Sequence, residues 1–401
     1  YTTLFRSFYL KQKNADCSYK NFKTHGVYME RVVIFICFLQ EIMQIYITNE
    51  TFVYFYSLML KLNTNDTVNF LSKLTFQRTW NAAKMLSSFF LSRILGKPFI
   101  WGMPVSLSVE PTTACNLSCP ECPSGLKSFT RPTGTIKLDF FKETIDAVNK
   151  ALIYLSFYFQ GEPFLHKGFL DMVSYASSKG IYTATSTNAH FLTDEVAKKT
   201  IESGIDRLII SIDGITQEIY EQYRIGGQVS KVLDGAKRIV KWKKELKSKT
   251  PFVVFQFLVV RPNEHQIHEV KKLAKEIGVD DIWFKTAQIY DFEQDPNKLI
   301  PLNDNYSRYK KNVDGKTIQK NQLQNHCWKM WHSNVITWDG KVVPCCFDKD
   351  AQHVLGDLKD TSMKEIWGNE KYETFRKELM LSRKNIDICS NCSEGLKVWS
   401  S

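Results

Sequence analysis

The sequence lacks a hydrophobic run long enough to cross a bilayer. The apolar stretch over residues 32–39 is ended by Gln40 and Glu41, whereas a spanning helix needs about 20 apolar residues. No signal-peptide cleavage pattern accompanies this stretch. We therefore expect a cytoplasmic protein.

A strong excess of one charge is also missing outside the N-terminal quarter of the chain. The formal net charge is +11, but residues 1–100 hold 12 Lys and Arg against 5 Asp and Glu, so most of the excess lies there. The remainder is nearly balanced, and basic side chains in such a setting are most often a solvated surface. We expect no nucleic-acid partner.

The cysteines do not form an even disulfide framework. Of ten cysteines, seven fall into two groups with metal-type spacing, which leaves Cys17, Cys37 and Cys346. An odd remainder argues against a secreted, disulfide-bonded protein and for a reducing compartment.

The first group consists of Cys115, Cys119 and Cys122, directly after a strand-like segment at 105–109. A cubane iron–sulfur cluster takes one thiolate per iron, so three cysteines leave one iron free to bind another molecule. On spacing alone, a partial zinc site or three buried thiols are the alternatives.

Beyond this loop, strand-like and helix-like patterns alternate through the chain. Six such βα repeats predict a parallel sheet with crossover helices and are too few to close an eight-stranded barrel. We predict an α/β fold, a partial (β/α)6 TIM-like barrel, with its chemistry at the carboxyl ends of the strands. The strand patterns lie at 105–109, 153–159, 181–187, 207–213, 252–260 and 281–285, and the helical patterns at 137–150, 167–179, 193–204, 229–248 and 263–277.

Motifs at successive strand ends resemble those of the radical S-adenosylmethionine (SAM) superfamily. Alone, the Gly-Glu-Pro of 161–163 and the Ser-x-Asp-Gly of 211–214 are typical of plain turns. With the C-x3-C-x2-C loop before them, they resemble the family's SAM site. The resemblance implies that the three cysteines hold a [4Fe–4S] cluster whose free iron binds SAM, and that polar groups hold the rest of SAM. The SAM-binding residues so predicted are Gly161, Glu162, Pro163, Ser186, Asn188, Ser211, Asp213 and Arg224.

One position departs from the family pattern. Members usually carry an aromatic residue just before the third cysteine, near the adenine of SAM, and this chain has Glu121 there. The adenine contact must come from elsewhere, and the sequence does not assign it.

The second group of cysteines lies near the C-terminus. Four thiolates complete either a [4Fe–4S] cluster or a structural zinc site, and spacing does not decide between them. The arrangement resembles the auxiliary-cluster domain of radical SAM enzymes, in its short form, twitch, rather than the longer SPASM form with about seven cysteines. The resemblance implies one auxiliary [4Fe–4S] cluster on Cys327, Cys345, Cys389 and Cys392. Cys345 stands at the family's distance from Gly340, which makes Cys346 a buried neighbour, although the two could exchange roles.

We predict four segments along the chain. Residues 1–67 form an extension without clean periodicity or an initiator Met, which need not be native coding sequence, and residues 68–100 an amphipathic helical segment. Residues 101–300 form the radical SAM core, and residues 301–401 the SPASM/twitch-like domain. Docking on the barrel is the plainer role for 68–100; contact with a membrane surface is the sharper interpretation, which we do not favour.

The resemblance implies an enzyme that cleaves SAM reductively to a 5′-deoxyadenosyl radical and abstracts hydrogen from a substrate. An electron donor such as flavodoxin or ferredoxin would be its partner. The single-cluster spacing favours net oxidation of a sugar- or cyclitol-like small molecule, by an oxidoreductase. Modification of a ribosomally made peptide or protein is the alternative, and a non-catalytic metal-binding scaffold is the alternative of another class. The sequence assigns no catalytic acid or base.

Overall fold

The computed structural model describes residues 64–320 and 323–395. The chain divides into two compact units, Tyr1–Ser72 and Lys73–Ser401. The described part of the first unit contains helix α4 (Thr64–Ser72). The predicted extension therefore lies almost entirely outside the described residues, as do Cys17 and Cys37.

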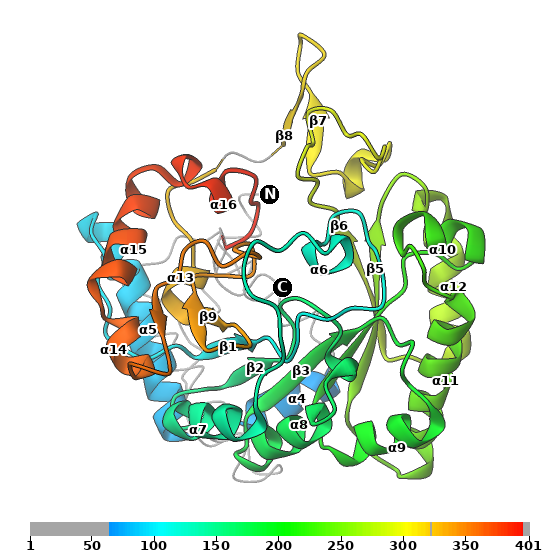
Figure 1. The fold of residues 1–401 in the computed structure, drawn as a ribbon, viewed down its shortest axis with the longest axis horizontal. Coiled ribbons are helices and arrows are strands. Elements are labelled where there is room, and N and C mark those ends of the chain that lie inside the picture. Colours follow the sequence, from blue (N-terminus) through cyan, green and yellow to red (C-terminus); the bar gives the residue numbers. More distant parts are fainter. Residues whose placement is uncertain (1–63, 321–322, 396–401) are drawn as a thin grey trace, which may run out of the picture. The chain divides into compact units, whose positions relative to one another are not determined.

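The second unit is built on a nine-stranded sheet with the order β11-β10-β9-β1-β2-β3-β4-β5-β6 (Figure 1). Neighbouring strands from β1 to β6 are all parallel, as βα repeats require. This confirms the predicted α/β partial barrel. The six strands are β1 (Ser106–Val109), β2 (Tyr154–Ser156), β3 (Tyr182–Thr187), β4 (Arg207–Ser211), β5 (Phe252–Val259) and β6 (Asp281–Thr286).

Crossover helices cover the outer face of this sheet (Figure 1). Their apolar stripes pack against every second residue of the strands, as Leu208, Ile210 and Phe255 show. Thr193 caps the start of one helix, and Gly278, with φ of 85°, ends another. The helices are α7 (Leu138–Val148), α8 (Phe169–Ser178), α9 (Asp194–Glu202), α11 (Val229–Glu245) and α12 (Ile267–Ile277); the shorter α6 (Pro123–Leu126), η2 (Pro163–Leu165), α10 (Gln217–Tyr223) and η3 (Glu264–Gln266) lie in the connections.

The inner face of the sheet is polar toward the carboxyl ends of the strands, whereas an apolar cluster of Ile209, Phe252, Val254 and Trp283 occupies its other part. Side chains alternate along a strand, so the residues between the helix-facing ones point to the concave side. A parallel sheet buried on both faces carries near-continuous apolar strands, whereas this face is partly open and rich in hydroxyl groups, which suits a polar ligand. Its polar residues include Ser108, Ser156, Ser186, Ser211, Gln256 and Lys285.

The C-terminal region continues the same sheet. Strand β9 (Ser333–Ile336) pairs in parallel with β1, and β10 (Lys341–Val343) and β11 (Gly356–Asp357) add antiparallel strands. Strands β7 (Tyr309–Lys311) and β8 (Thr317–Gln319) form a separate hairpin. The remaining helices are η4 (Asp304–Tyr306), α13 (Lys329–His332), α14 (Met363–Trp367), α15 (Glu370–Ser382), η5 (Arg383–Asn385) and α16 (Asp387–Ser390).

Helix α5 (Phe76–Leu95) docks on this unit. The buried Arg78 donates to the carbonyl oxygens of Asn149 and Lys179, and Phe89 packs edge-on against Trp331. Part of the helix surface remains apolar and exposed, so membrane-surface contact stays a prediction. Within the described ranges, no helix has both the length and the apolar character to span a membrane. The exposed apolar residues of α5 include Phe76, Trp80, Ile94 and Leu95.

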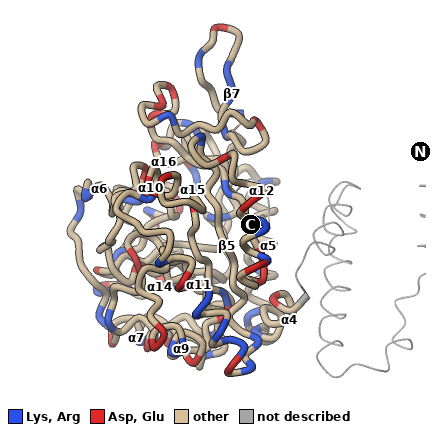
Figure 2. The backbone as a smooth tube through the Cα atoms, turned by 90° about the vertical axis from the view of Figure 1, so that its right-hand side faces the viewer, with Lys and Arg blue, Asp and Glu red and all other residues tan. Residues whose placement is uncertain are grey.

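Surface charges of both signs are interspersed along the described chain (Figure 2). Several form pairs one helical turn apart, such as Lys199 with Glu195 at 2.7 Å. This mixture agrees with the balanced charge expected for the part of the chain beyond residue 100.

Candidate functional site

The first cysteine group lies on the loop between β1 and α6, at the carboxyl end of the sheet. A Cβ on Gly125 would lie 2.6 Å from the backbone nitrogen of Cys119, so α6 is packed tightly on the loop. Cys119 is buried in an apolar cluster with Tyr223 and Val260, against which Cys115 and Cys122 also pack.

The three thiols share one electrostatic environment. The pKa of Cys115 is raised to about 11, chiefly by burial and to a smaller extent by the charges of Glu162, Cys122 and Cys119. Burial also raises the pKa of Cys119, while Arg224, whose Nη1 lies 3.8 Å from its Sγ, lowers it. Thiolates crowded in this way are costly unless a metal cluster replaces their protons, so the donor set suits an iron–sulfur cluster.

The Gly-Glu-Pro motif is locked against the cysteine loop. Gly161 has φ of 77°, and a Cβ there would lie 2.1 Å from the carbonyl oxygen of Thr112, so this position accepts only glycine. The following residue, Glu162, is 3 % exposed. Its Oε1 accepts from Thr187 Oγ1 at 2.7 Å, and its Oε2 accepts from the Asn188 amide at 2.8 Å.

Glu162 has little remaining capacity to accept hydrogen bonds. A carboxylate offers about four acceptor positions, and a third protein donor, the Phe164 amide, lies 3.3 Å from Oε1. Burial raises the pKa of Glu162, whereas its bonds with Asn188 and Thr187 lower it. Its contact with the SAM amino group remains a prediction; the structure adds that Glu162 fixes the end of β3.

The other predicted SAM-binding residues gather at the same edge. Ser186 and Ser211 lie on the inner face with their hydroxyl oxygens 3.4 Å apart. Asp213 forms an ion pair with Arg224 and accepts from the Leu258 amide at 2.7 Å. The remaining two belong to neighbouring loops: Pro163 begins η2, and the Asn188 side chain donates to Asn116 Oδ1 at 2.7 Å.

Sequence reasoning gave no individual role to Tyr220 and overlooked His190. The Tyr220 hydroxyl is buried and has no hydrogen-bond partner within the described ranges. Burial raises its pKa, and Asp213, Cys119 and Glu162 raise it further, which places the hydroxyl within this site. His190 stacks on its ring at 6.4 Å. An orphaned buried hydroxyl beside the cysteines fits a bound polar ligand such as SAM.

The residue that departs from the family pattern has a structural role here. Glu121 Oε2 accepts from the Tyr290 amide at 2.9 Å, and the Glu121 carbonyl accepts from Lys349 Nζ at 3.2 Å. The Lys349 ammonium also lies 4.6 Å from the centre of the Tyr290 ring. Glu121 thus ties the cysteine loop to the second cysteine region.

The second cysteine group converges from distant parts of the sequence. The pKa of Cys389 is raised to about 12 and that of Cys392 to about 11, chiefly by burial, and the charge of Cys327 contributes to both shifts. Burial likewise raises the pKa of Cys345, and the charges of Cys346, Cys392 and Cys327 also raise it. In the described ranges, no three Cys, His, Asp or Glu side chains are arranged to hold a single metal ion.

A buried guanidinium accompanies these thiols. Arg383 is 1 % exposed, and its Nη2 lies 3.3 Å from Cys392 Sγ and donates to the Glu394 carbonyl at 2.7 Å. No carboxylate in the described chain lies within ion-pair distance of it. Burial opposes its charge, yet the charges of Cys327 and Cys392 raise its pKa on balance. Thiolates of a bound cluster would supply the missing negative charge.

The expectation that Cys346 is buried was wrong. Cys346 is exposed, and its Sγ lies 4.0 Å from Lys329 Nζ. Neighbouring side chains leave an extended or turning backbone in different directions, so Cys345 faces the thiols while Cys346 does not. This supports Cys345 as the ligand, which stays a prediction.

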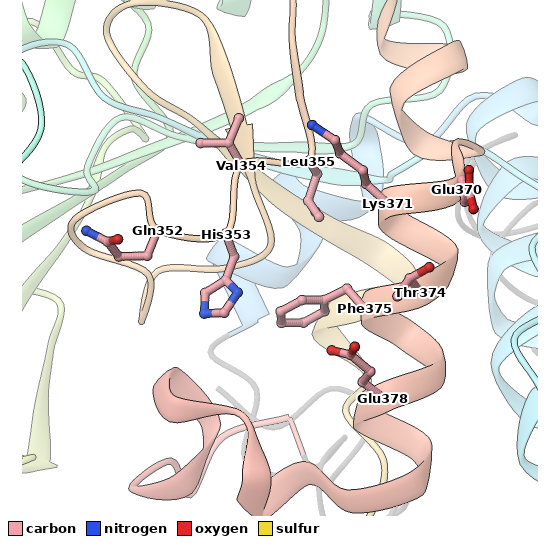
Figure 3. A pocket seen from close by; sticks show the side chains of 9 residues that line it. All are labelled: Gln352, His353, Val354, Leu355, Glu370, Lys371, Thr374, Phe375 and Glu378. Atoms are coloured by element: carbon pink, nitrogen blue, oxygen red, sulfur yellow. The ribbon is translucent and has the colours of Figure 1, made fainter.

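Two surface pockets lie outside the inner face of the barrel. One, of about 400 Å³, is lined by residues 352–355 and α15, where His353 packs edge-on against Phe375 (Figure 3). The other, of about 310 Å³, lies between α6 and residues 347–350. None of the predicted SAM-binding or cysteine residues lines either pocket.

Family models match both halves of this arrangement. The radical SAM superfamily model matches residues 109–277, and the iron–sulfur cluster-binding domain called SPASM matches residues 327–393. These two segments contain the first and the second cysteine group, respectively.

Curated relatives align with 47% to 72% of this chain. The tungsten-containing aldehyde ferredoxin oxidoreductase cofactor-modifying protein of Pyrococcus furiosus is 26% identical over 328 residues, covering 72% of this chain and 86% of that protein. The AdoMet-dependent heme synthase of Methanosarcina barkeri is 25% identical over 310 residues, 68% of this chain and 84% of that protein. The PqqA peptide cyclase of Bradyrhizobium diazoefficiens is 25% identical over 193 residues, 47% of this chain and 48% of that protein.

Solved structures share the fold. Streptococcus suis SuiB bound to S-adenosylmethionine has a TM-score of 0.55 at 12% identity, covering 74% of this chain and 72% of that one. The anSMEcpe protein with bound AdoMet has a TM-score of 0.53 at 21% identity, covering 72% and 87%. At these identities, the likeness shows a common fold.

Proposed function

This chain belongs to the radical SAM superfamily and carries a C-terminal SPASM domain, and from that premise we propose that it oxidises a polar small molecule held on the inner face of its barrel. The enzyme uses a [4Fe–4S] cluster with SAM in the barrel and an auxiliary iron–sulfur cluster in the SPASM domain. When bound and reduced, the first pair supplies a 5′-deoxyadenosyl radical, the reagent that takes a hydrogen atom from a C–H bond.

The observation that carries the proposal is the polar inner face between the two cysteine groups. On β5, the inner residue Leu258 packs against the same apolar cluster as Cys115 and Cys122. Its partner in the ladder, Lys285 on β6, lies among charged groups of the C-terminal region, including Glu394. A substrate at these two residues would lie between the apolar cluster of the first cysteines and Glu394, which follows Cys392 by two residues.

The residues around the first site would bind and orient rather than transfer protons. Cys115, Cys119 and Cys122 would hold the cluster, and Glu162 would position Asn188 while accepting from the SAM amino group. Asp213 and Arg224 neutralise each other, so their pair would brace the site, and the free Tyr220 hydroxyl would donate to SAM. Apolar packing around Cys119 excludes water from that side.

Oxidation of an alcohol to a ketone removes two hydrogens, which leave as a hydrogen atom, a proton and an electron. The electron needs an acceptor, and the four C-terminal thiols beside Arg383 are where this chain can hold one. An external donor such as flavodoxin or ferredoxin would supply the electron that starts the reaction.

Modification of a peptide is the second candidate. It is supported by the PqqA peptide cyclases among the curated relatives. The two candidate functions differ in the size of the product, because the first modifies a small metabolite and the second modifies a peptide.

The test is anaerobic incubation of reconstituted protein with SAM, a reductant and an extract of small metabolites from its own cells. We expect 5′-deoxyadenosine to form, and one metabolite to lose two hydrogens, with deuterium from that metabolite appearing in 5′-deoxyadenosine. Formation of 5′-deoxyadenosine that a peptide fraction stimulates and a metabolite fraction does not would favour the second candidate. No 5′-deoxyadenosine under any condition would refute both.

A further inference from the structure

We propose that the substrate carries an anionic group, a phosphate or a carboxylate, and that Lys285 on the inner face of the barrel binds it. This inference rests on the proposed function, because it names the chemical class of that site's substrate. Nothing in the cysteine or SAM-binding motifs requires a lysine here.

Lys285 lies at the boundary between the two halves of the site. It is half-buried on β6, and its ladder partner Leu258 packs against the same apolar cluster as Cys115 and Cys122. Its ammonium lies 5.6 Å from the centre of the Trp283 ring, two residues back on the same face. The side chain therefore lies along the inner face of the sheet.

The groups around Lys285 are mostly cationic. Arg308, Lys329 and Arg207 oppose its charge, and Glu394 is the acidic group that favours it. Glu394 is already shared, with Oε1 3.5 Å from Arg308 Nη2 and Oε2 3.7 Å from Lys329 Nζ. Among the described residues, no carboxylate lies within ion-pair distance of Lys285. Three of the four charged groups that act on Lys285 are thus cationic.

Two further features show that the positive groups of Arg308 and Lys285 are not fully satisfied by the described residues. The Arg308 Nη1 atom is buried without a hydrogen-bond partner in the described chain. Burial is the main reason that the pKa of Lys285 falls, which means that its charged form is costly in the free protein. An anion from outside would relieve both deficits.

Neutralisation of the auxiliary cluster is a different explanation for some of these cations. Lys329 lies two residues from Cys327 and 4.0 Å from Cys346 Sγ, and Arg383 touches Cys392. Lys285 differs from them, because it belongs to a barrel strand, and among the described residues it has no hydrogen bond to a thiol. Replacing Lys285 therefore distinguishes binding of a substrate anion from neutralisation of the auxiliary cluster.

The experiment measures anion binding by the reconstituted holoenzyme under anaerobic conditions, with SAM at saturation so that the SAM carboxylate site is filled. Inorganic phosphate and malonate are titrated calorimetrically, with neutral inositol for comparison. The variants are Lys285→Met, Lys285→Arg and, as a matched control, Lys310→Met, which removes an exposed lysine from the β7–β8 hairpin. Tighter binding of phosphate would indicate a phosphorylated substrate, and tighter binding of malonate a carboxylated one.

We expect wild type to bind one of the anions saturably, and inositol not at all at the same concentrations. Lys285→Met should weaken the anion about tenfold or more, as expected for loss of a charge-assisted hydrogen bond. Lys285→Arg should retain most of the affinity, which excludes misfolding as the cause, and Lys310→Met should match wild type.

Absence of saturable anion binding in wild type would overturn the inference. So would wild-type affinity in Lys285→Met, or an equal loss in Lys310→Met. Formation of 5′-deoxyadenosine is measured in the same samples. Its absence alongside intact anion binding would refute the proposed function, whereas its presence without anion binding would refute this inference alone.

Discussion

The two cysteine groups place thiols in dry surroundings with different balancing charges. At the first, the guanidinium of Arg224 lies near Cys119 but is paired with Asp213. At the second, Arg383 touches Cys392 and has no carboxylate partner in the described chain. The guanidinium of the first site is thus compensated before the thiolates are counted, whereas that of the second site is an uncompensated positive charge.

The two groups also differ in enclosure. Two of the three cysteines in the first group are half-buried, Cys115 and Cys122, whereas only Cys345 is half-buried among the four predicted ligands of the second group. A Cβ on Gly395 would lie 2.2 Å from Cys327 Sγ, so backbone closes over the second group. The comparison indicates that the first site is built to admit a ligand and the second to hold charge.

The strongest test of this division is removal of the first group alone. Replacing Cys115, Cys119 and Cys122 by Ala should abolish reductive cleavage of SAM, because no ligand for the first cluster remains. The second group should still assemble, so reconstituted protein should retain about four irons, with a reduced-state EPR spectrum that SAM does not alter. Wild-type formation of 5′-deoxyadenosine would show that the cysteine assignment is wrong.

A methyl group at Gly161 should close the ligand-admitting site by displacing the backbone beneath it. In Gly161→Ala, the new Cβ would meet the Thr112 carbonyl at 2.1 Å, so the cysteine loop must move. The matched control is Gly226→Ala, which has a similar φ of 79° but nothing within 4 Å of its Cβ. That control should lose about 1–2 kcal/mol of folding free energy from backbone conformation alone.

We expect SAM binding to be lost in Gly161→Ala and kept in Gly226→Ala, measured by equilibrium titration of reconstituted protein. Unfolding by denaturant in the same preparations separates local displacement from global loss of structure. Equal SAM affinity in the two variants would mean that the contact between Gly161 and Thr112 does not shape the site.

The parts of this molecule that sequence predicted are those with a local pattern. The βα alternation predicted the strands and crossover helices within a few residues, and the strand-end motifs predicted residues that do lie together. The role of Glu121 was not predictable, because its partners Tyr290 and Lys349 are distant in sequence. The pairing of β9 with β1 was missed for the same reason. The prediction that Cys346 is buried was wrong because the sequence of two adjacent cysteines does not indicate which of them faces inward.

A smaller change, Glu162→Gln, sharpens the account of the first site. The variant keeps the shape of the side chain but loses its charge, and a charge-assisted hydrogen bond contributes about 1.5–3 kcal/mol. SAM affinity should fall about tenfold or more. Thr187→Val is the control, because it removes a donor to Glu162 and leaves the carboxylate in place. Unchanged SAM affinity in Glu162→Gln would remove Glu162 from the binding site.

The smallest expected effect concerns the second site, in protein that already lacks the first three cysteines. If Cys327, Cys345, Cys389 and Cys392 hold a redox-active [4Fe–4S] cluster, Arg383 should favour its reduced form, which carries one more negative charge. Arg383→Met should therefore lower the reduction potential, while Arg383→Lys should lower it less. An EPR-monitored redox titration measures both.

The same titration decides between iron and zinc at the second site. Filled-shell zinc has no redox chemistry, so it gives neither an EPR signal on reduction nor a potential that Arg383 can shift. Stoichiometric zinc in protein purified anaerobically from iron-replete cells, with no signal on reduction, would make the SPASM domain a structural cap. In that case the uncompensated charge of Arg383 would neutralise a permanent anion, four thiolates on one zinc ion. Arg383→Met would then lower the stability of the metal site and leave electron transfer untouched.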